Sequence, residues 1–118
     1  MIKLFSCSLL AILFLESKSC DQKMESSVPE CIQQMIATYK SKPVQNPPAA
    51  IYQYDYNNQK CYYVVAPCCD QMNTVYDSNC NVLCHPDGGF SGKGDNKCPD
   101  FNTAKTNEVL IWKDDRKE

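Results

Sequence analysis

The chain has 118 residues, with 12 Lys or Arg against 14 Asp or Glu, and a formal net charge of −2 at pH 7. This slightly acidic balance argues against a nucleic-acid partner, for which a basic face is expected. The length is enough for one small domain and no more, so the nine cysteines are a high density.

The first residues are typical of an export signal. Lys3 supplies a positive start, and Leu4 to Leu15 form an apolar stretch. That stretch is too short to span a bilayer, which takes about 20 apolar residues. Small residues, Ser17 and Ser19, then precede a cysteine, Cys20, at the positions that a signal peptidase reads.

Cys20 occupies the one position where cleavage and lipid attachment would coincide. We therefore predict a signal peptide over residues 1–19, a lipid anchor on Cys20 with a tether over 20–28, and a single Cys-rich domain over 29–118. The alternative is that Cys20 is simply the first cysteine of a disulfide.

Cysteines define how the predicted domain is stabilised. Eight remain once the signal is removed: Cys20, Cys31, Cys61, Cys68, Cys69, Cys80, Cys84 and Cys98. In an oxidising compartment this density predicts disulfide bonds, because a domain of this size buries little apolar surface. If Cys20 carries a lipid, one of the other seven stays free or pairs between molecules.

A helix is predicted to begin after Ser27, a capping residue, with Pro29 in its first turn. Pro43 ends it, and the apolar residues between them recur at the spacing of one helical face: Ile32, Met35, Ile36 and Tyr39. This stripe predicts core packing. Cys31 lies near it and is expected to tie the helix to the rest of the domain.

Period-two patterns and turn residues predict short strands at 51–56, 61–66, 74–77, 81–84 and 108–112. The first two form a hairpin around Asn57 and Asn58. The expected fold class is α+β, with one N-terminal helix packed on a small antiparallel sheet and stabilised by disulfides.

One disulfide is predicted from strand pairing. If the strand from Cys61 pairs with the strand from Thr74 so that positions summing to about 141 face each other, Cys61 lies opposite Cys80. Cys68 and Cys69 are adjacent, so they are expected to bond separate partners among Cys31, Cys84 and Cys98.

The segment Asp87–Asp100 is the place where local chemistry is most suggestive. It holds four glycines within seven residues, and Asp87, Asp95 and Asp100 could offer oxygens to Ca²⁺. A tight loop closed by Cys84 and Cys98 accounts for the glycines without an ion, and it is the preferred interpretation.

The remaining candidates for chemistry are a histidine and a set of tyrosines. His85 stands beside Cys84, but an oxidised cysteine is neither a thiolate ligand nor a nucleophile, so no cofactor, metal or catalytic residue is predicted. Tyr52, Tyr54 and Tyr56 share one sheet face, where an aromatic platform for a glycan or peptide is the alternative to packing.

Several segments resemble a family of small bacterial predicted lipoproteins whose shared domain has no assigned function. The resemblance covers roughly Cys31 to the C-terminus and rests on Pro43–Ala49 (PVQNPPA), Tyr62–Val64 (YYV), Cys68–Gln71 (CCDQ), Asp87–Asp95 (DGGFSGKGD) and Cys98–Phe101 (CPDF). It implies export and lipid anchoring, and it transfers no catalytic residue. Members of that family often lack cysteines matching Cys61 and Cys80, which fits an accessory bridge between these two.

The expected function is that of an exported, lipid-anchored protein of the bacterial cell envelope. It would act as a binding or structural module with a protein or glycan ligand, and not as an enzyme. The membrane would be a partner through the lipid. The alternatives are a small protease inhibitor, because Cys84 to Gly88 shares a C-x-x-D-G string with Kazal-type inhibitors, and a metal-handling or redox protein.

Overall fold

A computed structural model of the chain describes residues 27–117. The predicted signal peptide and Cys20 lie outside the described residues. Within the described part of the chain, no helix is long and apolar enough to cross a membrane.

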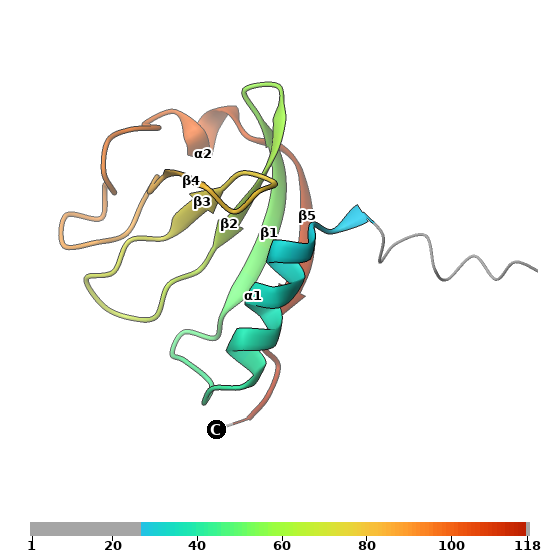
Figure 1. The fold of residues 1–118 in the computed structure, drawn as a ribbon. Helices are drawn as coiled ribbons and strands as arrows, with labels where there is room; N and C mark the ends of the chain where they lie inside the picture. Colours follow the sequence, from blue (N-terminus) through green and yellow to red (C-terminus); the bar gives the residue numbers. More distant parts are fainter. Residues whose placement is uncertain (1–26, 118) are drawn as a thin grey trace, which may run out of the picture.

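A single antiparallel sheet of five strands, in the order β4-β3-β2-β1-β5, organises the fold (Figure 1). The elements in chain order are α1 (Glu30–Lys40), β1 (Ala50–Tyr56), β2 (Gln59–Val64), β3 (Thr74–Tyr76), β4 (Val82–Cys84), α2 (Phe101–Ala104) and β5 (Thr106–Lys113). The predicted antiparallel sheet with a helix and disulfides is confirmed. The expectation of one N-terminal helix is wrong, because α1 lies within the chain and the short helix α2 is a second one.

Helix α1 covers one face of the sheet (Figure 1). Its residue Ile32 is fully buried in a cluster with Ile51 and Tyr62. The predicted apolar stripe therefore packs against the core, as expected. The N-cap is Pro29 and not Ser27. The Pro29 carbonyl accepts the backbone N–H groups of Ile32 and Gln33.

The C-terminal residues hold the other end of α1. The Arg116 guanidinium donates to the carbonyl oxygens of Tyr39, Lys40 and Lys42 at 3.0 to 3.2 Å, where the last turn of a helix lacks its own partners. Its other partner is the buried carboxylate of Asp114, at 2.8 Å. The hydrogen bond to Arg116 lowers the pKa of Asp114, so this carboxylate stays ionised.

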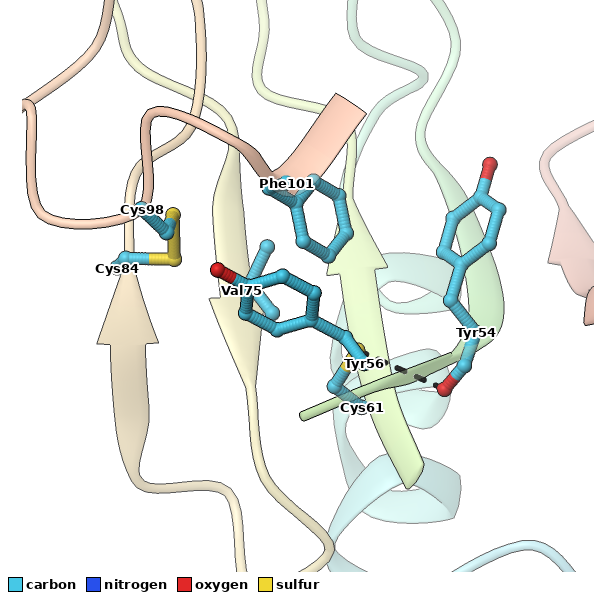
Figure 2. Close-up of a cluster of buried hydrophobic side chains, with 7 residues drawn as sticks. All are labelled: Tyr54, Tyr56, Cys61, Val75, Cys84, Cys98 and Phe101. Carbon is cyan, nitrogen blue, oxygen red and sulfur yellow. Dashed lines mark hydrogen bonds between the residues drawn. A yellow bond between two sulfur atoms is a disulfide. The ribbon is translucent and has the colours of Figure 1, made fainter. Parts of the chain in front are cut away.

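A second cluster lies on the opposite face of the sheet, where α2 places Phe101 (Figure 2). The rings of Tyr54 and Tyr56 meet Phe101 edge-on, with centroids 5.8 and 5.1 Å away. Both tyrosines are buried. Packing, the preferred interpretation of these tyrosines, is confirmed for them, whereas Tyr62 points to the α1 face.

The disulfides link Cys31 to Cys80, Cys84 to Cys98 and Cys68 to Cys69, and they leave Cys61 free and buried. The expected link between α1 and the rest of the domain is confirmed through Cys31. The predicted bond between Cys61 and Cys80 is wrong. The expectation of separate partners for Cys68 and Cys69 is also wrong, because they bond to each other.

The register of β2 and β3 explains the first error. Tyr63 faces Val75, so opposed positions sum to 138 and not to 141. A shift by an odd number of residues exchanges the two faces of a sheet. Cys61 accordingly lies in the Phe101 cluster, while Cys80 packs on the α1 face beside Cys31. Burial raises the pKa of the Cys61 thiol to about 11, so it stays protonated at neutral pH.

We predict that the two long-range disulfides differ in their contribution to stability. The cysteines of Cys31–Cys80 are 49 residues apart and those of Cys84–Cys98 are 14 apart. The chain-entropy model then gives about 4 kcal/mol for the first and about 3 kcal/mol for the second. Denaturant unfolding of the two double Cys→Ser variants should show this order in the free energy of unfolding.

The control for that comparison is Cys61→Ser, which removes a thiol without opening a loop. Peptide mapping under non-reducing conditions checks the pairing itself. A linked peptide that joins Cys61 to Cys80 would contradict the register of β2 and β3 given above.

Candidate functional site

The loop of residues 85–97, called here the glycine loop, follows β4 and is closed by the Cys84–Cys98 disulfide. Its two cysteines are 6.0 Å apart between Cα atoms. The predicted loop closed by Cys84 and Cys98 is confirmed. The loop lies at the end of the sheet away from α1 (Figure 1).

Close approaches to the backbone require glycine at two positions in this loop, and a third glycine faces a side chain. A Cβ on Gly94 would overlap the carbonyl oxygen of His85, and one on Gly88 would lie 2.8 Å from the carbonyl oxygen of Gln71. A Cβ on Gly89 would lie 2.9 Å from the Met72 side chain. All three also have positive φ angles, from 67° to 79°, which glycine adopts without steric cost.

Backbone hydrogen bonds hold the folded loop in place. The N–H of Asp95 donates to His85 at 2.8 Å, and that of Gly94 donates to Gly88 at 3.2 Å. The N–H of Gly89 donates to Gln71 at 3.0 Å, which joins the loop to the corner between β2 and β3. The glycine loop is therefore fixed both internally and against a neighbouring segment.

The carboxylate of Asp87 anchors the start of the loop. It accepts the Tyr63 hydroxyl at 2.9 Å, the Asn73 amide at 2.7 Å and the Asn102 amide at 3.1 Å. These donors come from β2, the corner before β3, and α2. Burial, followed by the hydrogen bond to Asp87, raises the pKa of Tyr63, so its hydroxyl remains a donor.

Asp95 and Asp100 are the other two residues that could have offered oxygens to Ca²⁺. Their carboxylates have separate partners. Asp95 accepts the backbone N–H of Lys97, and Asp100 accepts the Tyr56 hydroxyl at 2.6 Å. Among residues 27–117 there is no group of three His, Cys, Asp or Glu side chains placed to hold a metal ion. The three carboxylates serve as hydrogen-bond acceptors within the fold.

His85 is also occupied by local contacts. Its Nδ1 atom lies 3.0 Å from the Thr74 hydroxyl and 3.3 Å from the Asn73 carbonyl oxygen. The sulfur of the neighbouring Cys84 is bonded to Cys98. The arrangement therefore contains no Cys84–His85 nucleophilic pair.

Phe90 is the feature of the loop that no sequence pattern indicated. It is 94% exposed, more than any other large apolar residue between residues 27 and 117. Met72, which is 39% exposed, lies against the adjacent Gly89. Polar, exposed Gln71, Ser91 and Lys93 surround them in the sequence. The sequence signal for this exposed residue was a single aromatic residue among glycines and polar residues.

Comparison with known proteins places the chain in a family. The model of a domain of unknown function, DUF6970, matches residues 37–114. The chain belongs to the DUF6970 family. No curated protein and no solved structure matches it. The matched range includes the whole sheet and the glycine loop, so both are parts of the family domain.

We predict that Gly94→Ala disrupts the loop far more than Gly92→Ala does. Both residues have positive φ, 67° and 74°, so both substitutions carry the left-handed penalty of about 1 to 2 kcal/mol. Only the Gly94 Cβ would meet the backbone at His85, because the Gly92 Cβ has nothing within 4 Å. Hydrogen exchange of the loop amides should rise strongly in the first variant, and the free energy of unfolding should fall further. Equal effects would contradict the tight backbone packing.

Proposed function

We propose that this protein is a binding module of the bacterial cell envelope and that Phe90 is the residue it inserts into a partner. The observation that carries the proposal is the almost complete exposure of a phenylalanine on a loop fixed by glycine contacts, hydrogen bonds and a disulfide. A rigid loop loses little conformational entropy when it binds, which favours affinity.

The expected partner is a protein with an apolar pocket. Burying a phenylalanine side chain contributes about 1.5 to 3 kcal/mol, which is typical of one interface hot spot within a polar rim. Met72, which lies against the adjacent Gly89, would supply adaptable apolar contact, and the exposed polar residues Gln71, Ser91 and Lys93, close to Met72 and Phe90 in the sequence, would supply the polar rim. No charge change or reaction is needed for this role, and we propose no enzymatic activity.

We predict that a photo-crosslinking amino acid at position 90 captures a discrete partner in intact cells. The same amino acid at position 82 is the matched control, because Val82 is also an exposed apolar residue, at 55%, but lies on β4. Adducts of defined mass should appear at position 90 and not at 82. In purified form, Phe90→Ala should weaken binding of the captured partner by about 10- to 100-fold.

Two results would contradict the proposed role of Phe90. One is the same set of adducts, or none, at both positions. The other is cosedimentation of the protein with vesicles of phosphatidylethanolamine and phosphatidylglycerol that Phe90→Ala abolishes, because that result would assign the residue to a bilayer and not to a protein pocket.

We further propose that the module is exported and attached to the membrane by a lipid on Cys20. The support is the sequence pattern of residues 1–20 and the resemblance to predicted lipoproteins. The remaining residues before α1 would then act as a tether between the lipid and the domain.

We predict that Cys20→Ala releases the protein from the membrane fraction, because the substitution removes the only thiol at the cleavage point. Cys61→Ala is the matched control and should leave the protein in that fraction. Intact-mass measurement of the wild-type protein should show a lipid-modified N-terminal cysteine. An unmodified Cys20 after cleavage would contradict the anchor and leave the Phe90 experiment unaffected.

A further inference from the structure

A groove of about 620 Å³ runs between α1 and β5. These two elements lie on the side of the molecule away from the glycine loop (Figure 1). Val109, Ile111 and Trp112 of β5 line it on one side, and Val28 and Ile36 line it from the α1 side. Its volume is in the range of small-molecule sites, about 300 to 1,000 Å³. The groove is separate from the Phe90 surface.

A β-bulge brings two large side chains into this groove. Trp112 pairs with Ile51 and Leu110 pairs with Tyr52, so Ile111 is an extra residue in β5. Both Ile111 and Trp112 therefore pack on the α1 face, where strict alternation would place only one of them. Bulges also interrupt the outer edge of a strand, which disfavours the addition of another strand to β5.

The groove carries a positive charge at one end only. Lys40 is the only charged side chain among the residues that line it. Within residues 27–117, no hydrogen bond or ion pair engages the Lys40 ammonium group. Lys40 follows Tyr39, whose ring stacks on Trp112 with centroids 5.9 Å apart. The cation therefore marks the Trp112 end, and Val28 and Val109 lie toward the start of α1.

We infer that this groove binds a long-chain carboxylate, such as a fatty acid. The aliphatic chain would lie along the apolar residues of the lining, and the carboxylate would meet Lys40 at the Trp112 end. An unbranched chain can follow a groove between a helix and a strand, and Lys40, the single charged residue of the lining, complements one carboxylate.

Trp112 is the only tryptophan of the chain, so its fluorescence reports on this groove directly. The probes are 5-doxyl-stearate and 16-doxyl-stearate, added to protein purified from cells that express the full chain. Both should quench Trp112 in a saturable way. The 5-doxyl probe should quench more strongly, because the carboxylate at Lys40 places the start of the chain beside Trp112.

Two variants test the binding mode. Lys40→Gln should weaken binding of 5-doxyl-stearate by up to about fivefold, as for an exposed ion pair, and should leave binding of its neutral methyl ester unchanged. Val109→Asp should weaken both probes by at least about tenfold, because it places a carboxylate among the apolar residues of the lining. Val109 is 47% exposed, so this variant should fold, and its unfolding curve checks that.

Three outcomes would overturn the inference. The first is no saturable quenching. The second is equal quenching by both probes that neither variant changes, which would indicate nonspecific partitioning. The third is a dimer in light scattering that Val109→Asp dissociates and 5-doxyl-stearate does not affect, because a second copy of the chain would then cover the groove.

Discussion

The hydrogen bonds to the carboxylate of Asp87 fix the base of the glycine loop, which exposes Phe90. The carboxylate joins β2, the corner before β3, the glycine loop and α2 through three side-chain donors. A single acceptor with charge-assisted hydrogen bonds to separate segments fixes their relative positions more firmly than one neutral pair would. The loop can therefore expose an aromatic residue without being mobile at its base.

The sheet divides the apolar interior into two thin clusters, one under α1 and one under α2. Each contains one long-range disulfide: Cys31–Cys80 lies with the α1 cluster and Cys84–Cys98 with the Phe101 cluster. A domain of this size buries a small fraction of its surface, so neither cluster contributes as much stability as the core of a larger protein. Each of these two disulfides therefore supplements the cluster that contains it.

The sequence predicted the closed loop of the candidate site, but not which residue of the loop is exposed. The density of glycines and the spacing of Cys84 and Cys98 indicated a closed loop, and the structure contains it. The exposure of Phe90 could not be inferred from the sequence, because exposure depends on which segments pack against the loop. From the sequence, Asp87 was a possible calcium ligand. In the structure its carboxylate instead accepts hydrogen bonds from Tyr63, Asn73 and Asn102.

Local patterns in the sequence determined the helix with its apolar stripe, the five strands and their antiparallel arrangement, because periodicity and turn residues act between near neighbours. Tertiary structure alone decided which cysteines pair. A three-residue change in the register of β2 and β3 moves Cys61 to the other face of the sheet from Cys80. Register depends on the length of the corner between the strands, where the Asn73 side chain accepts the N–H of Ala66 at 2.8 Å. No periodicity encodes such a contact, and only the folded chain brings it about.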